Sequence, residues 1–464
     1  MSIKRAFSNK DTTIWSENGS TGNTGASPIG EVFSVSGGKL GKVTSRKEYA
    51  RILMNFNLSS LTAGIVSTKT LPDPRTNTSA SAYLKVFNAK HGGEQATSFN
   101  IDVFPISRVW NEGVGLDLDR LSNSGWANAL SAQSSLAWSS SGGDFITDSN
   151  SATQYFDSGE EDLIVNRTPI FNAWLNGTTA TNGVIIKLTE TQEASSGSLS
   201  STNYYTKKFY LRETNTRRAP YIELQWPGAI TDNRSAIAFN NTGSVFFYNI
   251  VNGQLQDLAS TSAFPGNITI SGLSSANTSF SAITTNLTAE RFSKGVYKCN
   301  IGTLPLTASV YTSFRDNWYI SASPTANYTF SFTAINPASG FSNFQTGSYK
   351  LTLKNLREHY EKCSIARLRM HIRDTSMQLL SMTGTTTALN NFICTDGTFE
   401  IREKKTDLVE IAADNLSHDR DGNFFTIDTG NLYVGVQYKI VIKLTIRGET
   451  YYYDEPDHWS FEVE

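Results

Sequence analysis

Short segments in which apolar and polar residues alternate, each bounded by turn-forming residues, recur along the whole chain. Successive side chains of a β-strand point to opposite faces of a sheet, so this pattern is typical of strands with one buried face. The segments are Arg51–Leu58, Tyr83–Phe87, Phe99–Phe104, Gly183–Leu188, Lys208–Leu211, Tyr221–Trp226, Ser235–Phe239, Ser244–Ile250, Gly295–Ile301, Trp318–Ser321, Ser348–Lys354, Ala366–Ile372, Phe399–Arg402, Tyr438–Leu444 and Trp459–Val463. They predict an all-β protein.

The composition favours the same fold class. Charged residues make up 18% of the chain, against about 25% in an ordinary globular protein. Helices faced with Glu and Lys would need more charge, whereas the abundant Ser, Thr, Asn and Gly suit short strands and turns. The aromatic residues, with 26 Phe, 19 Tyr and 8 Trp, can fill several small cores.

The chain is too long for one ordinary core, because 464 residues exceed the usual ~100–200 residues of a domain. Pro227–Gly228 breaks the strand pattern, and the density of charge rises after Ser348. We therefore expect three tandem β-sandwiches, over residues 1–228, 229–347 and 348–464, the last of them of immunoglobulin-like size.

Three local patterns predict particular elements. Pro169–Leu175 carries apolar residues at helical spacing, with Thr168 as the expected N-cap and Asn176–Gly177 as the stop. Asn252–Gly253 predicts a tight β-hairpin. Ser134–Asn150, which is rich in Ser, Gly, Asp and Asn, predicts a long surface loop.

Charge and targeting patterns limit the partners. The formal net charge is −2, so we expect no basic field that would hold nucleic acid. Cys299, Cys363 and Cys394 are too few for a disulfide framework, which suggests synthesis in a reducing compartment. Neither the apolar core of a signal peptide nor an apolar stretch of membrane-spanning length is found in the sequence. We expect a soluble protein made in a cytoplasm, with no membrane partner.

The sequence holds no Gly-x-Ser-x-Gly elbow, no His-Glu-x-x-His helix and no phosphate loop. Asp117 with Asp119, and Glu160 and Glu161 with Asp162, offer carboxylates for a glycosidase pair. Such clusters occur in any chain, so we interpret them as solvated loop charges. We therefore expect no enzymatic activity and no cofactor.

The sharpest local motif is Ser417–Asn423, followed by Asp428. Asp419, Asp421 and Asp428 would take the third, fifth and twelfth positions of a helix-flanked calcium loop. The first position holds Ser417, and no helical pattern flanks the loop. A hairpin turn is therefore the favoured interpretation, with no metal, and calcium is the weaker alternative.

Sugar recognition requires exposed aromatic rings beside polar groups. The candidate rings are those of Trp110, Trp126, Trp138 and Trp226, although a sandwich core also recruits Trp. Arg212 is a further candidate. We expect Phe209–Glu213 to be a central strand, with Phe209 and Leu211 in the core and Arg212 pointing outward. There, a cross-strand ion pair is favoured over contact with a sugar or a neighbouring subunit.

Five short pieces of the first segment follow one another in a recognisable order. They are Asp11–Trp15, Ala50–Ser59, Val109–Gly113, Asn166–Gly177 and Phe209–Trp226. In this order they resemble the DNRLRE family of jelly-roll modules, which are related to carbohydrate-binding modules. The resemblance implies a jelly-roll β-sandwich for the first domain and a surface glycan as a ligand.

Four pieces of the last segment form a second pattern: Leu353–Tyr360, Ala366–Ile372, Asp421–Asp428 and Phe461–Val463. They are similar to a β-sandwich found in structural proteins of large tailed bacteriophages. This resemblance implies a non-enzymatic virion protein of the neck, collar or tail, made in the host bacterial cytoplasm. Its partners would be other virion proteins and further copies of itself, in a symmetric ring or array. The alternative is a glycan-binding protein for receptor recognition or decoration.

Overall fold

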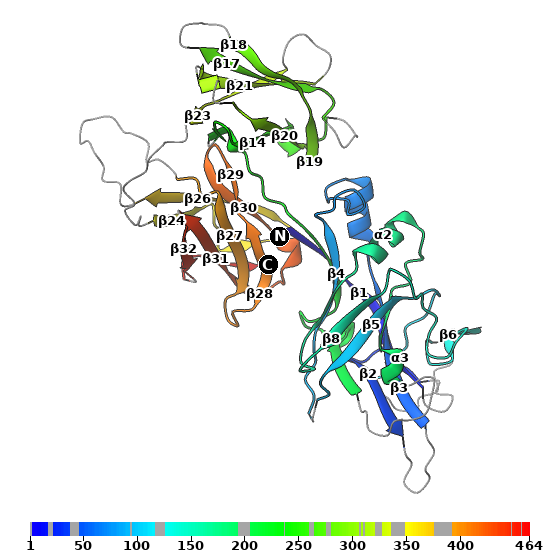
Figure 1. Cartoon of the computed structure of the whole chain (residues 1–464). Helices are drawn as coiled ribbons and strands as arrows, with labels where there is room; N and C mark the ends of the chain where they lie inside the picture. Colours follow the sequence, from blue (N-terminus) through cyan, green and yellow to red (C-terminus); the bar gives the residue numbers. More distant parts are fainter. Residues whose placement is uncertain are drawn as a thin grey trace. The chain divides into compact units, whose positions relative to one another are not determined.

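The structure, a computed structural model of the chain, is nearly all β, which confirms the predicted fold class (Figure 1). The residues described are 2–16, 22–37, 46–92, 95–116, 126–193, 205–235, 237–258, 264–274, 280–305, 308–309, 311–320, 327–335, 349–374, 392–446, 448–455 and 457–464.

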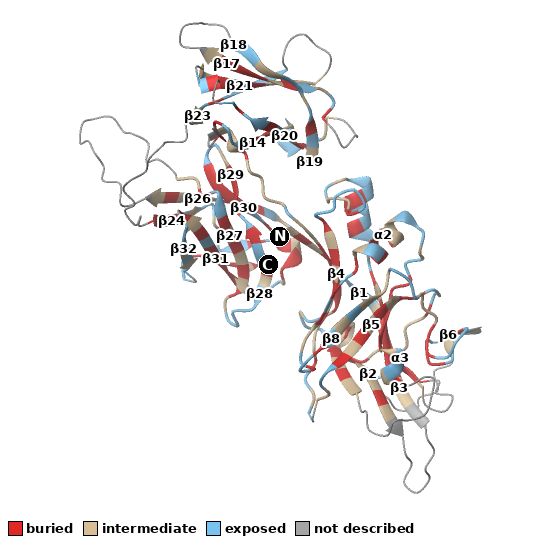
Figure 2. Ribbon diagram, in the orientation of Figure 1, coloured by how far each residue is buried: buried red, intermediate tan, exposed pale blue. Residues whose placement is uncertain are grey.

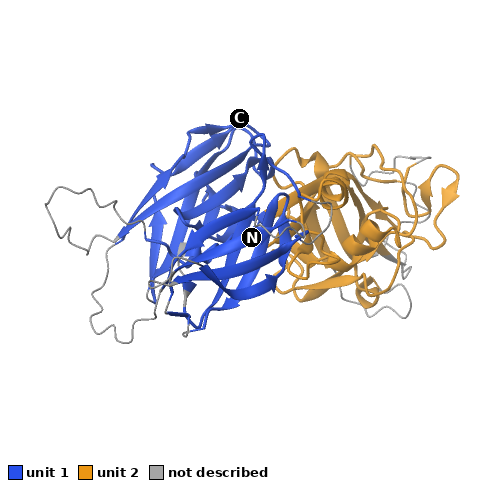
Figure 3. Ribbon diagram, turned by 90° about the horizontal axis from the view of Figure 1, so that it is seen from above, with its two compact units in different colours: residues 1–2, 227–464 blue, residues 3–226 orange. Residues whose placement is uncertain are grey.

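The chain divides into two compact units, which Figure 3 colours separately. The first comprises residues 3–226, and the second comprises residues 1–2 with residues 227–464. Residues 229–347 and 348–464 share the second unit, so their separation into two domains stays a prediction.

One continuous sheet forms most of the first unit. Its strands are β1 (Ser2–Trp15), β2 (Ile29–Gly37), β3 (Arg46–Phe56), β4 (Ser81–Val86), β5 (Phe99–Pro105), β8 (Ala152–Phe156), β9 (Leu163–Asn166), β10 (Val184–Leu188), β11 (Tyr205–Tyr210) and β12 (Tyr221–Trp226). The strand order is β8-β5-β10-β3-β1-β12-β4-β9, and β2 pairs with both β3 and β11. The long strand β1 therefore links the two halves of the sheet.

Both halves of this sheet contribute to one apolar core, so the unit is a β-sandwich. Ile52 of β3 and Val103 of β5 lie in the same buried cluster as Leu84 of β4 and Ile222 of β12. Along β4 and β5 the buried residues alternate with less buried ones, as the sequence pattern predicts, whereas residues 50–54 of β3 and 221–224 of β12 are buried without interruption (Figure 2).

The predicted helix is present as α2 (Thr168–Asn176), and Ile170, Phe171 and Trp174 bury its apolar face in the core. Gly177 ends it in the left-handed conformation, with φ of 70°. The expected cap is wrong by one residue: Arg167 is the N-cap, and the Thr168 hydroxyl accepts a hydrogen bond from the Ala82 amide instead. The shorter helical elements are α1 (Ser59–Thr62), η1 (Ala63–Ser67), α3 (Glu190–Glu193) and η2 (Arg212–Thr214). No helix among the described residues is long and apolar enough to cross a membrane.

The described part of residues 229–347 forms four small sheets. The elements are η3 (Asn233–Ser235), β13 (Ile237–Ala238), β14 (Thr242–Tyr248), β15 (Ile250–Val251), β16 (Gln254–Leu255), β17 (Asn267–Ser274), β18 (Phe280–Leu287), β19 (Ala289–Ser293), β20 (Val296–Thr303), β21 (Tyr311–Tyr319), β22 (Tyr328–Phe332) and β23 (Ala334–Ile335). The sheets are ordered β14-β20-β19, β18-β17-β21-β22, β13-β23 and β15-β16. Asn252 and Gly253, with φ of 51° and 77°, join β15 to β16, which confirms the predicted hairpin.

Where the structure describes residues 348–464, they form two further sheets. The elements are β24 (Tyr349–Lys354), β25 (His359–Tyr360), β26 (Ile365–Asp374), β27 (Asp396–Glu403), β28 (Val409–Asn415), β29 (Ser417–Asp419), β30 (Gly422–Asp428), η5 (Thr429–Asn431), β31 (Gln437–Ile446), β32 (Glu449–Asp454) and β33 (Ser460–Val463). One sheet is β24-β26-β30-β29, and the other is β25-β33-β31-β27-β28 with β32 beside β31. The rings of Phe399 and Phe425 stack at 4.4 Å between them, as in a sandwich.

Candidate functional site

Three strands of the first unit turn charged side chains away from the core, because side chains alternate between the faces of a sheet. Ile52 of β3 faces the core, whereas the neighbouring Arg51 lines a cavity with Asp102 and Phe104 of β5 and Lys187 of β10. β10 pairs with both β3 and β5, and Lys187 lies directly opposite Asp102. The outer face of the sheet thus gathers cations, a carboxylate and a ring.

The loop between β5 and β8 covers the rest of this outer face. Trp110 and Trp138 pack there with Leu53 and Ile185 in a second buried cluster. The prediction of a plain surface loop at Ser134–Asn150 is therefore wrong in part. The tract contains β7 (Leu136–Ala137), which pairs with β6 (Ser131–Gln133), and it contributes apolar side chains to the cluster.

Two adjoining cavities lie at this loop: the first is between the loop and the sheet, and loop residues alone line the second. One has a volume of about 350 Å³ and the other of about 420 Å³, and Ser140, Gly143 and Phe145 line both. The second also holds an ion pair, with Arg108 Nε 2.8 Å from an Asp144 carboxylate oxygen. We call the two cavities together the groove.

Two buried cations share one buried carboxylate beneath the groove. Arg51 Nε and Nη2 donate to the two carboxylate oxygens of Glu193 at 3.0 and 2.7 Å. Lys187 Nζ lies 3.2 Å from Glu193, whose side chain is fully buried. Burial lowers the pKa of Lys187, although the negative charge of Glu193 opposes this shift. This triad holds its charges in a low-dielectric setting, where hydrogen bonds to a ligand are strengthened.

The polar groups at the base of the groove keep unused hydrogen-bonding capacity. A guanidinium has five N–H donors, and Arg51 uses three of them within the described part of the chain: two on Glu193 and one on the Gly142 carbonyl at 2.8 Å. Lys187 Nζ donates to the Leu188 carbonyl at 2.7 Å and faces Glu193, which leaves one of its three donors. Donors are therefore available to a guest.

An acceptor and two rings complete the groove. Asp102 accepts a hydrogen bond from Thr153 Oγ1 at 2.6 Å through one oxygen only. The rings of Phe104 and Phe145 stack with centroids 4.9 Å apart. This combination of N–H donors, one carboxylate and apolar ring surface suits a ligand that presents hydroxyls beside C–H faces.

The tryptophans expected as sugar platforms are mostly buried. Trp110 is 0% and Trp138 6% exposed, and their indole N–H groups donate to the carbonyls of Asn182 and Asn128. Neither ring offers a free face, so both predictions are corrected: the covering loop uses these rings for packing. Trp126 is 37% exposed, and its role as a platform stays a prediction.

Trp226 is half-buried against the core of the first unit. Its ring therefore serves packing at least in part.

Arg212 lies outside the strand that the alternation predicts. β11 ends at Tyr210 and pairs with β2, so the expected central strand through Glu213 is wrong, although Phe209 and Leu211 are buried as predicted. Arg212 opens the turn η2 and pairs with Glu112 at 3.1 Å and with the adjacent Glu213. The favoured ion pair is present, but a turn and a distant loop make it.

Arg212 contacts two members of a cluster of three carboxylates that could hold a cation. Ligand atoms of Asp11, Glu112 and Glu213 lie within 4.8 Å of one another. Burial and the negative charge of Glu213 raise the pKa of Asp11 to about 7, although a hydrogen bond from Ser8 opposes the shift. The guanidinium of Arg212 already neutralises part of this charge, so we interpret the cluster as an internal ion-pair network.

The proposed calcium loop does not converge in the structure. β29 and β30 form a hairpin across residues 420–421, which confirms the predicted hairpin turn. Asp419 is engaged by Arg369, with contacts of 2.7 and 2.9 Å, and Asp428 accepts from the Gly430 amide at the far end of β30. A seven-residue strand spans about 20 Å, so Asp419 and Asp428 cannot bind one ion.

The acidic clusters considered for glycosidase chemistry have local partners. Glu161 accepts from the amides of Asp157 and Ser158, and Asp162 accepts from the Asn88 amide at 2.7 Å. The Glu161 bonds fix the turn at residues 157–161, and the Asp162 bond joins this segment to Asn88, which follows β4. Asp117 and Asp119 lie outside the described residues.

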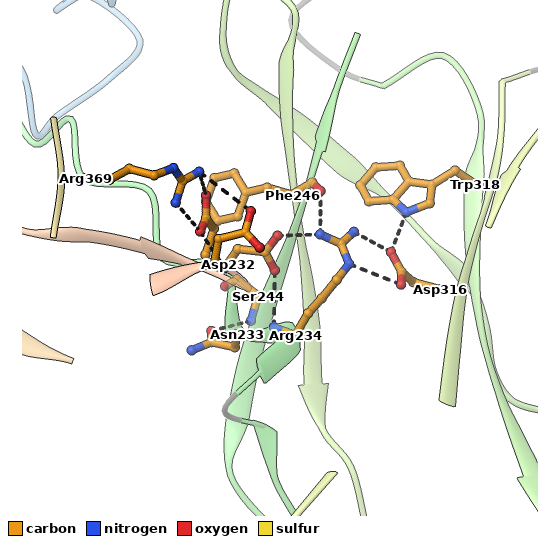
Figure 4. A network of polar contacts seen from close by, with 10 residues as sticks. Asp232, Asn233, Arg234, Ser244, Phe246, Asp316, Trp318 and Arg369 are labelled. Carbon is orange, nitrogen blue, oxygen red and sulfur yellow. Dashed lines mark hydrogen bonds and ion pairs between the residues drawn. The ribbon is translucent and has the colours of Figure 1, made fainter. Parts of the chain in front are cut away.

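The second unit contains a different network, drawn in Figure 4. Arg234 lies between two carboxylates: Nη1 donates to Asp232 and to the Phe246 carbonyl, and Nε and Nη2 donate to Asp316. Asp316 also accepts from Trp318 Nε1 at 2.8 Å. Burial raises the pKa of Asp232, although Arg234 opposes the shift.

The segment that carries Asp232 also pairs with the last part of the chain. Thr231 and His418 form a parallel bridge; the Asp232 amide donates to the His418 carbonyl at 3.0 Å, and the His418 amide donates to the Ile230 carbonyl at 2.8 Å. We call the contacts of Ile230–Arg234 the clamp. It ties β29 to β14 and β21.

Sequence reasoning missed Arg51, Lys187 and Glu193. Lys187 is a charged residue inside the apolar run Val184–Leu188, which was a usable signal, because an unpaired ammonium is costly to bury. The spacing of residues in the sequence does not predict that Lys187 contacts Glu193, nor that the loop between β5 and β8 covers it.

No protein-family model and no curated protein matches the chain. Among solved structures, a titin structure is similar over 49% of this chain and 92% of its own, at 8% identity and a TM-score of 0.15. A putative membrane anchored protein from Corynebacterium diphtheriae has 8% identity over 100% and 97%, with a TM-score of 0.16. A DUF4785 family protein from Legionella pneumophila has 8% identity over 82% of both chains, with a TM-score of 0.14. Likenesses this weak carry no argument about function.

Proposed function

We propose that the chain is a non-enzymatic structural protein of a tailed-bacteriophage virion, at the neck, collar or tail. It binds other virion proteins through the faces of its β-sandwiches and assembles with further copies of itself in a ring or array. Many weak contacts of this kind add up through multivalency.

The clamp is the observation that supports this proposal most. Asp232 and Asp316 are buried and Arg234, with a side chain 10% exposed, pairs with both, so separating the sheets they join would leave buried charges without partners. Such a joint keeps the sheets of residues 227–464 together as long as every partner is present, which suits a chain that holds a fixed place in a particle. The resemblance of residues 348–464 to phage structural proteins points the same way.

Mass spectrometry of purified particles tests the proposal. We expect peptides from the whole chain at an abundance comparable with other structural proteins, after particles are separated from lysate on a density gradient. If the chain is found in infected-cell lysate but not in the particle fraction, the proposal is wrong.

Recognition of a surface glycan is a second candidate function, and the groove is the observation that favours it. The groove joins donors, an acceptor and stacked rings on an outer sheet face. A glycan array probed with the full chain tests it, and flat signal on every glycan would remove it.

A further inference from the structure

We propose that the groove binds a neutral polysaccharide chain, whose hydroxyls bond to Arg51, Lys187 and Asp102 and whose C–H faces lie on Phe104 and Phe145. The inference rests on the glycan-recognition function proposed above. It adds the ligand class and the residues that select it.

The first argument is the burial of charges beside a cavity. Arg51 is 5% exposed and Lys187 4% exposed, yet both line the groove. Apolar residues of similar volume usually serve stability as well as a buried ion pair does. Charges kept at such a place, with N–H donors left over, are suited to bind a polar guest.

The second argument is the balance of charge. Arg51 and Lys187 lie among three carboxylates, those of Glu193, Asp102 and Glu190, and in the adjoining cavity Arg108 is matched by Asp144, so no cation is in excess. A carboxylated or sulfated sugar would need a cation without a partner. The groove instead offers individual N–H donors and carboxylate acceptors from groups whose charges are already neutralised. Such groups fit hydroxyls, which both donate and accept hydrogen bonds.

The third argument is the shape of the site. The cavity over Arg51 and Lys187, at about 350 Å³, lies within the range of roughly 300–1,000 Å³ typical of small-ligand pockets. The second cavity, of about 420 Å³, continues it past Phe145. Two cavities in a row accommodate successive units of a chain better than a single sugar.

Titration calorimetry of the full-length chain tests the inference. The probes are neutral hexasaccharides of glucose, mannose, galactose and xylose, with hexagalacturonate as the anionic comparison. We expect at least one neutral probe to bind, and Asp102→Asn to weaken it by about tenfold or more, as for loss of a charged hydrogen-bond partner. Phe145→Leu keeps apolar volume but removes the ring, and should also weaken binding.

The matched control is Asp73→Asn, the same chemical change at an exposed carboxylate paired with Arg75. It should bind as the unchanged chain does, and circular dichroism should show all three variants folded. Preference for hexagalacturonate, or binding of a neutral probe that Asp102→Asn and Phe145→Leu leave unchanged, overturns the inference while glycan recognition stands. Failure of every probe here, together with a flat array, overturns both.

Discussion

Two arginines with little exposed surface, one in each unit, show how the same residue can stabilise a joint or line a ligand site. Arg234 uses four of its five N–H donors, on Asp232, Asp316 and the Phe246 carbonyl. Arg51 uses three, on Glu193 and the Gly142 carbonyl, and it lines a cavity. A nearly saturated guanidinium between sheets is a joint, whereas an unsaturated one beneath a cavity can bind a guest.

The carboxylate partners differ in the same way. Asp316 is 0% exposed and also accepts from an indole N–H, so its lone pairs are committed to the fold. Asp102 lies half-buried in the groove with one hydrogen-bond donor, Thr153. Substitutions in the clamp should therefore cost stability, and substitutions in the groove should cost binding.

The largest effect is expected for Arg234→Met. The change leaves Asp232 and Asp316 buried without a cation, which costs about 3–5 kcal/mol in the free energy of unfolding. Denaturant unfolding followed by tryptophan fluorescence measures it. Arg75→Met, at an exposed ion pair, should cost under about 1 kcal/mol. Equal losses in the two variants would show that the clamp is not a special joint.

Arg51→Met should be less destabilising. Lys187 remains 3.2 Å from Glu193 and still neutralises it, so we expect a loss of about 2 kcal/mol by the same assay. The same variant should bind the neutral hexasaccharide more weakly than its stability loss explains. A loss as large as that of Arg234→Met would instead make the triad a structural joint.

The acidic cluster around Asp11 should make the free energy of unfolding depend on pH. Burial raises the pKa of Asp11 to about 7, well above its value of ~3.9 in an unfolded chain. Between these values the folded state holds more protons, so this carboxyl makes stability fall as the pH rises from about 4 to about 7. Asp11→Asn removes the titration, and the chain should then lose about 2–3 kcal/mol less between pH 5 and pH 8, since about two pH units of linkage at ~1.4 kcal/mol each are removed. Calorimetric scans of both proteins across this range measure the difference; parallel curves would contradict the raised pKa.

Asp102→Asn should have the smallest effect on folding. Asparagine can still accept from Thr153, so the free energy of unfolding should change by less than about 0.5 kcal/mol. Asp316→Asn, the same substitution in the clamp, should cost at least about 1 kcal/mol, because Arg234 loses a charged partner. If Asp102→Asn destabilised the chain more than Asp316→Asn, the contrast between a binding groove and a structural clamp would be wrong.

The segments that alternation predicted all overlap strands of the structure, because alternation reports which side chains share a face, but β2, β17, β18 and β28 were not among them. Alternation reports nothing about what covers the other face. Trp110 and Trp138 were candidate platforms for that reason, and only the packing of the loop on Leu53 and Ile185 shows them to be buried. Arg212 was misplaced because the alternation continues past Tyr210, where the chain leaves the sheet for a turn.

Hydrogen exchange of the full chain, with and without a neutral hexasaccharide that binds, tests the contrast between groove and clamp most directly. We predict slower exchange in peptides that cover residues 139–147 and 184–188, and unchanged exchange in those that cover residues 230–248. Protection at residues 230–248 with none at the groove would contradict the assignment of binding to the first unit and of a structural joint to the second.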